Sequence, residues 1–178
     1  MDDATATQLG LIVEIRDALD EADIEWWLFG GWAMDFHAGD VTRNHADIEL
    51  FVWLKDADAA KQALVRTGFV ALPGLHPDEG QPLLKGGQEV GAWYLVCDEA
   101  GAIATPGRWA DWPFPAGAFD EPRMHIGDIE APAMSAEGLL EMKMRFAQHP
   151  YGASLREKDR ADIARLQAII ASRSIDDW

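Results

Sequence analysis

The stretch GGWAMDFHAGDVTRNHADIELFVW, residues 30–53, ends in a short segment that carries a pair of acids. In its last eight residues, 46–53, apolar and acidic side chains alternate, which predicts a strand with one buried and one polar face. Asp47 and Glu49 share the polar face with their Cα atoms about 6.6 Å apart, so both carboxylates can converge on one Mg²⁺ ion. The solvated face of an ordinary strand has the same pattern. The pair alone therefore leaves both interpretations open.

A glycine pair opens the stretch, directly after the apolar segment 25–29, which we predict to be a strand. Residues 32–38 suit two turns of helix, and Gly39 can adopt the left-handed conformation that ends them. The bare backbone N–H groups of Gly30 and Gly31 then lie near the positive end of a helix, where a triphosphate can bind. A tight turn is the alternative interpretation of the pair.

Two further side chains lie just ahead of the acids. Arg43 and His45 could each contact a phosphate or a substrate where the strand begins, and either could equally be an ordinary surface residue. Asp35, inside the short helix, is expected to be structural and to orient Arg43.

Together these residues resemble the signature of the small antibiotic nucleotidyltransferases, above all the aminoglycoside 2''-adenylyltransferase-like proteins and the lincosamide nucleotidyltransferases. The matching positions are Gly30, Gly31, Trp32, Asp35, Gly39, Thr42, Arg43, His45, Asp47 and Glu49. The resemblance extends over residues 8–170 and includes the segments SAEGLLEMK (135–143) and LREKDRADIARL (155–166).

The resemblance implies a minimal nucleotidyltransferase core, related to the polymerase-beta-like enzymes. It implies that Asp47 and Glu49 bind Mg²⁺ and that the Gly30–Gly31 segment holds ATP or another nucleoside triphosphate. The implied reaction transfers a nucleotidyl group, usually AMP, to a hydroxyl of a small antibiotic, with pyrophosphate as the leaving group.

Two lysines in the late helices match the same families. Lys143 and Lys158 would then contact the phosphates. A solvated helix lysine is the alternative for Lys143, and an ion pair with Asp162, one turn further along the helix, is the alternative for Lys158.

The sequence departs from the family pattern at two positions. The usual second acid is Asp, and here Glu49 is one methylene longer. The family also carries a third carboxylate on a later strand, and that position falls on Gly91. Glu89 lies two residues earlier on the same face, so a bulge or register shift would bring it in as a catalytic acid. The alternative is a catalytically impaired protein that binds nucleotide or a small molecule without transferring anything.

The remaining pattern predicts an α+β fold with a mixed sheet flanked by helices. We expect helices over 7–21 and from Asp56 to Gly68, a strand over 69–72, and antiparallel strands over 81–85, 88–97 and 102–107. Two helices, 136–149 and 155–173, follow Ser135 and Ser154, the second with a capping box between Ser154 and Glu157. We expect one domain over 1–178, with a core of 1–133 and C-terminal helices over 134–178.

The net charge of the chain limits the kinds of partner that we expect it to bind. The 178 residues include 15 basic and 31 acidic side chains, for a net charge of −16, which repels nucleic acid and attracts cations. We therefore expect no nucleic-acid partner and a small, hydroxylated acceptor, with a polycation such as an aminoglycoside slightly favoured. The absence of a signal sequence and of a long apolar run predicts a cytoplasmic protein without a membrane partner. The oligomeric state is left open.

One loop is rich in aromatic residues and proline. Trp109, Asp111, Trp112 and Phe114 could form a wall for a cationic substrate, or they could pack a long loop onto the core.

Overall fold

The computed structural model describes residues 2–74 and 76–176. Helices and strands alternate in the first part of the chain: α1 (Asp3–Glu21), β1 (Trp26–Phe29), α2 (Gly30–Ala38), β2 (Asp47–Trp53), α3 (Ala57–Arg66) and β3 (Val70–Ala71). Then follow β4 (Gly80–Lys85), β5 (Gln88–Cys97), β6 (Ile103–Ala104), β7 (Met124–Ile126), β8 (Ile129–Ala131), α4 (Ala136–Phe146) and α5 (Glu157–Asp176). Two short 3₁₀ helices, η1 (Leu54–Asp56) and η2 (Gly107–Trp109), precede α3 and follow β6.

The main sheet is mixed, as the sequence predicts. Its strand order is β1-β2-β5-β4-β3, and β6 pairs with the end of β5. All these pairings are antiparallel except that of β2 with β5, two strands far apart in the sequence. The predicted antiparallel strands after α3 are confirmed, and the parallel pairing joins them to the acid-bearing strand.

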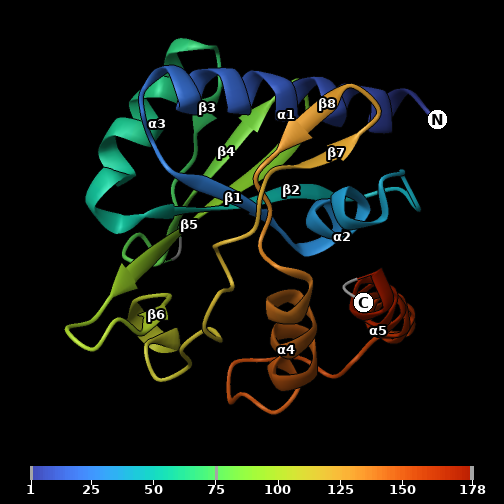
Figure 1. The fold of residues 1–178 in the computed structure, drawn as a ribbon. Coiled ribbons are helices and arrows are strands. Elements are labelled where there is room, and N and C mark those ends of the chain that lie inside the picture. Colours follow the sequence, from blue (N-terminus) through green and yellow to red (C-terminus); the bar gives the residue numbers. More distant parts are fainter. Residues whose placement is uncertain (1, 75, 177–178) are drawn as a thin grey trace.

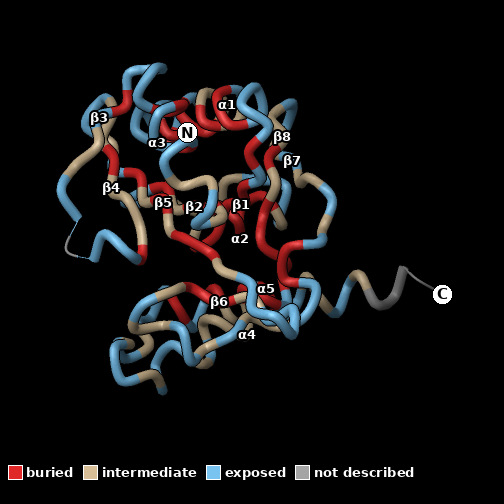
Figure 2. Tube along the Cα trace, turned by 90° about the vertical axis from the view of Figure 1, so that its left-hand side faces the viewer, coloured by how far each residue is buried: buried red, intermediate tan, exposed pale blue. Residues whose placement is uncertain are grey.

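Helices lie on both sides of this sheet (Figure 1). The helices α1 and α3 cover one face, and α4 and α5 lie side by side on the other. The apolar residues of β2, namely Ile48, Leu50 and Val52, have no exposed surface and pack toward α1 and α3. Figure 2 shows that the buried segments concentrate where α1, α2 and the sheet meet. The polar face of β2 is therefore the face directed toward α4 and α5.

Local signals set most of the helix ends. Gly39 has φ +71° and ends α2 in the left-handed conformation, as predicted. The hydroxyl of Ser135 accepts a hydrogen bond from the Gly138 N–H and caps α4. Asp56 is the N-cap residue of α3, as predicted, but its side chain makes no capping hydrogen bond.

The predicted capping box at the start of the last helix is wrong. The helix α5 begins at Glu157, so Ser154 lies outside it. The Asp159 carboxylate accepts the Arg156 backbone N–H at 2.9 Å, and it also accepts the guanidinium of the same residue at 2.8 Å. A charged carboxylate three residues further along thus satisfies the N–H group at the helix start.

Among the described residues, no helix is both long and apolar enough to cross a membrane.

Candidate active site

The polar face of β2 meets β5 in a continuous parallel register. Asp47 lies opposite Glu89, and Glu49 lies opposite Gly91, so these four residues share one face of the sheet. The pairing runs without a bulge through Trp53, so the predicted shift toward Glu49 does not occur and Glu89 stays beside Asp47. Among the described residues, no three His, Cys, Asp or Glu side chains form a group able to hold a metal ion. This face of the sheet therefore carries Asp47 and Glu49 on β2, with Glu89 of β5 beside Asp47.

The two acids on β2 differ in environment. Asp47 is exposed, whereas Glu49 is half-buried. Burial of the Glu49 carboxylate, with the nearby charge of Asp47 adding to it, raises the pKa of Glu49 from 4.5 to about 7. Nearby cations oppose this rise without cancelling it. Glu49 is thus a carboxylate that is costly to ionise until a further positive charge arrives.

The glycine pair packs directly against the side chains of this face. Gly30 has φ +66°, and a Cβ atom there would overlap the Glu49 carboxylate. A Cβ atom at Gly31 would overlap the His45 ring and lie 2.9 Å from the Arg43 guanidinium. The helix α2 begins at Gly30, two residues before its predicted start. The pair therefore forms the first turn of α2 and lets the helix terminus approach Glu49 closely.

A buried hydrogen-bond chain leads from α2 to Arg43. The Asp35 carboxylate accepts the Thr42 hydroxyl at 2.5 Å and contacts His45 Nε2 at 2.7 Å. His45 Nδ1 lies 3.0 Å from Arg43 Nη1. Because arginine can only donate, Nδ1 accepts this bond and Nε2 carries the proton given to Asp35. Asp35 is therefore connected to Arg43 through His45, in line with the prediction that it orients Arg43.

The side chain of His45 is 3% exposed, with both ring nitrogens engaged. That of Arg43 is 30% exposed. Of these two predicted phosphate contacts, only Arg43 reaches the surface.

Cations on α4, on α5 and just before α5 act on Glu49 through their charge. Lys143, Lys158 and Arg156 each lower the pKa of Glu49 through their charge. Lys158 is exposed and has no hydrogen bond or ion pair with any described residue, so the alternative ion pair with Asp162 does not form. The structure thus brings both predicted lysines to the acids. Sequence reasoning missed Arg156, whose only signal is its place in the segment 156–160, where basic and acidic residues alternate.

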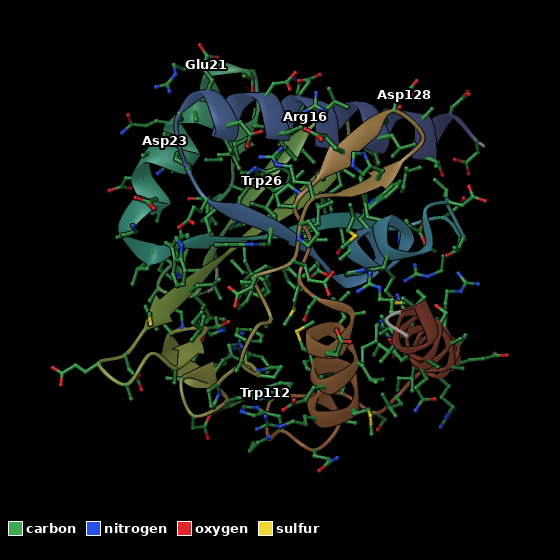
Figure 3. All side chains as sticks on the ribbon, viewed as in Figure 1. Arg16, Glu21, Asp23, Trp26, Trp112 and Asp128 are labelled. Carbon is green, nitrogen blue, oxygen red and sulfur yellow. The ribbon has the colours of Figure 1, made fainter. Side chains whose placement is uncertain are left out.

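The aromatic loop divides between two neighbours. The Phe114 ring packs against Phe51 and Phe119 in the core. The rings of Trp109 and Trp112 pack against Phe146, and Trp112 lies beside the end of α4 (Figure 3). Other partners of these two indoles are His149, Tyr151, Arg108 and Arg145. The second predicted alternative, packing onto the core, therefore holds for Phe114, whereas Trp109 and Trp112 pack against residues outside the core.

Comparison with known proteins finds relatives that match part of the chain. Over 44 residues, the chain is 50% identical to a 2''-aminoglycoside nucleotidyltransferase of Klebsiella pneumoniae and to one of Escherichia coli. That stretch covers 25% of this chain and 25% of each relative, so the chain matches a quarter of the length of these curated relatives.

Solved structures share the whole fold. The crystal structure of ANT(2'')-Ia in complex with adenylyl-2''-tobramycin superposes with a TM-score of 0.75 at 22% identity, covering 96% of this chain and 93% of that chain. The lincomycin-bound lincosamide adenylyltransferase LnuA gives a TM-score of 0.67 at 22% identity, covering 89% and 95%. These similarities confirm the predicted nucleotidyltransferase fold.

A family model extends the match along the sequence. The model described as aminoglycoside-2''-adenylyltransferase matches residues 11–166, a span that holds the glycine pair, the acids of β2 and the cations of α4 and α5. The resemblance seen in the sequence is thereby confirmed, and the chain belongs to the aminoglycoside-2''-adenylyltransferase family.

Proposed function

We propose that this protein is a Mg²⁺-dependent O-nucleotidyltransferase that moves AMP, or another nucleoside monophosphate, from a nucleoside triphosphate to a hydroxyl of a small molecule. One observation carries the proposal: the first turn of α2 packs against Glu49, and the charges of Asp47, Lys143, Lys158 and Arg156 all act on it. Family membership and fold agree with this reaction class.

The donor set on β2 suits Mg²⁺. Magnesium prefers oxygen ligands and is commonly bound by one or two carboxylates together with substrate phosphates. Asp47 and Glu49 supply two such carboxylates, and a cation beside Glu49 would offset the burial and the Asp47 charge that raise its pKa. When bound there, Mg²⁺ would neutralise charge on the phosphates and on the leaving pyrophosphate.

The chain's own residues then bind the triphosphate. Lys143, Lys158, Arg156 and Arg43 provide positive charge, and the backbone N–H groups of the Gly30–Gly31 turn lie at the positive end of α2. His45 holds Arg43 in place from within the protein.

In the transfer step, the acceptor oxygen bonds to the α-phosphorus while the bond to the bridging oxygen breaks. Pyrophosphate leaves, and the hydroxyl proton passes to a carboxylate. Asp47 and Glu49 are the residues that would hold Mg²⁺, which leaves Glu89, directly opposite Asp47 on the same face, as the acid that takes the proton.

The proposed acceptor is a small antibiotic of the kinds found in the solved neighbours. The solved neighbours carry an adenylylated tobramycin and a lincomycin. The net charge of −16 favours a polycationic aminoglycoside over a lincosamide. A cytoplasmic location stays a prediction from the sequence.

A catalytically impaired binding protein is the second candidate. It is favoured by Gly91, which leaves no carboxylate opposite Glu49. Such a protein would be stabilised by nucleotide or drug without turnover.

Pyrophosphate release tests the two candidates. The protein is incubated with MgATP, or each other Mg-nucleoside triphosphate, and a panel of aminoglycosides and lincosamides. Drug-dependent release that is lost in Asp47→Asn supports the transferase. Thermal stabilisation by MgATP without release from any pair supports the binding protein, and neither response would refute both.

A further inference from the structure

One acid of α5 joins two cations that come from different parts of the chain. The Asp162 carboxylate lies 2.9 Å from Lys143 Nζ on α4 and 3.3 Å from Arg43 Nη2, which precedes β2. Its side chain is 7% exposed, so these contacts are largely shielded from water. Arg43 and Asp162 are 119 residues apart in the sequence, so their contact joins distant segments of the chain.

Asp159 extends this arrangement by one turn of α5. It lies 3.7 Å from Lys143 Nζ and 2.8 Å from Arg156 Nε. The neighbouring cations lower the pKa of both acids, through hydrogen bonding with Arg156 for Asp159 and with Lys143 for Asp162, so both stay ionised at neutral pH. Asp159 and Asp162 thus arrange three cations that come from three segments of the chain.

The charges do not cancel in this cluster. Arg43, Lys143 and Arg156 carry three positive charges against the two negative charges of Asp159 and Asp162. Lys158, which has no ion pair with a described residue, adds a fourth positive charge, and this charge acts on Glu49. A positive remainder beside Glu49 is unusual in a chain with a net charge of −16. Burying an ion pair is costly and seldom the best route to stability, so a function for the spacing of these cations is the better explanation.

Resting on the proposed function, we propose that Asp162 is a positioning residue for the triphosphate: it fixes the spacing between Arg43 and Lys143 so that both engage phosphate oxygens. Asp162 does not contact the nucleotide itself. It acts through the two cations, which would otherwise be separate, flexible side chains that lose rotamer entropy when the nucleotide binds.

Asp162→Asn separates positioning from simple charge. Removing a negative charge beside a phosphate site strengthens phosphate binding if electrostatics alone matters. Loss of positioning has the opposite effect, and we expect the Kd for MgATP, measured by calorimetry, to rise about tenfold or more, with a similar rise in KM and a smaller change in kcat.

The control is Glu157→Gln, which makes the same change of charge on the same helix. Glu157 is exposed and has no hydrogen bond or ion pair with any described residue, so this variant should bind MgATP as the unaltered protein does. Asp162→Glu keeps the charge but moves the carboxylate by one methylene, and positioning predicts weaker binding there too. If Asp162→Asn fails to fold, which urea unfolding would show, Asp162→Glu becomes the variant that tests positioning.

The outcomes separate this inference from the proposed function. If the unaltered protein binds no Mg-nucleoside triphosphate, the proposed function fails. If it binds MgATP, and Asp162→Asn or, where that variant is unfolded, Asp162→Glu binds equally or more tightly, the role of Asp162 is refuted while the proposed function stands. Weaker binding by the folded variants with unchanged binding by Glu157→Gln supports the role.

Discussion

Gly91 lies directly opposite Glu49 in the parallel pairing of β2 and β5, and the indole of Trp93 leans over it. A Cβ atom at position 91 would lie 3.0 Å from Trp93 Nε1. That nitrogen is buried and has no hydrogen-bond partner among the described residues. The position at which the resemblance predicts a third acid therefore holds the edge of an indole, and a side chain at position 91 requires the indole to move.

The first prediction concerns this pair. Gly91→Asp should reduce the free energy of unfolding more when Trp93 is present than in a Trp93→Ala background. The reason is that the new side chain must displace the indole only when Trp93 is present. Urea unfolding of the two single variants and the double variant should give a coupling energy of about 0.5–3 kcal/mol. Additive effects would show that the indole adjusts freely. The double variant should also need less Mg²⁺ for half-maximal turnover than Trp93→Ala does.

Glu89→Gln tests the proposed proton acceptor. Because Glu89 lies opposite Asp47 and the cations lie around Glu49, we expect kcat to fall about 10²-fold with little change in KM for the nucleotide. Glu99→Gln, an exposed change in the turn after β5, is the matched control. An unchanged kcat in Glu89→Gln would remove Glu89 from the mechanism.

The raised pKa of Glu49 predicts a pH dependence of stability without metal. Between pH 4.5 and about 7, the folded protein keeps a proton that the unfolded chain has lost, so the contribution of Glu49 to stability falls as the pH rises. Glu49→Gln removes this titration. In EDTA at pH 8, the melting temperature of Glu49→Gln should exceed that of the unaltered protein by about 2–4 °C for each kcal/mol gained in the free energy of unfolding. At pH 4.5 the two melting temperatures should be equal. Equal shifts at both pH values would contradict the assignment.

The glycine pair yields a stability prediction with an internal control. Gly30→Ala places a Cβ atom against the Glu49 carboxylate and a non-glycine residue at φ +66°, so the free energy of unfolding should fall by at least about 1 kcal/mol. Gly10 lies exposed in α1, and a Cβ atom added there would have no neighbouring atom within 4 Å, so Gly10→Ala should raise the free energy of unfolding by about 0.5–1 kcal/mol. Equal stability of Gly30→Ala and the unaltered protein would refute the close approach.

Local periodicity predicted most of the elements. The alternation in 46–53 and the glycine after α2 act within a few residues, and the structure has both the strand and the helix end there. The β7–β8 hairpin was missed, although a two-residue turn at Gly127 and Asp128 joins the paired residues Ile126 and Ile129. A glycine opening a two-residue loop between isoleucines was the available signal.

The site was predictable in its parts but not in its connections. Asp47, Glu49 and the two lysines could be named because the family motif names them. Their relation to Glu89, Arg156 and Asp162 depends on contacts between strands and helices that are distant in the sequence. Neither the hydrophobic pattern nor capping residues carry that information.

The link from Asp162 to Arg43 also has a consequence for the order of folding. The acids and the first turn of α2 come from the first third of the chain, whereas most of the cations near them, namely Lys143, Arg156 and Lys158, come from residues 143–158. During synthesis, the acid-bearing strand therefore emerges well before those cations, and ordering across such a long loop is slow compared with local pairing. A nascent chain that lacks α5 carries the acids of β2 without Asp162 to join Arg43 to Lys143, so the proposed nucleotide binding should be among the last properties that the growing protein acquires.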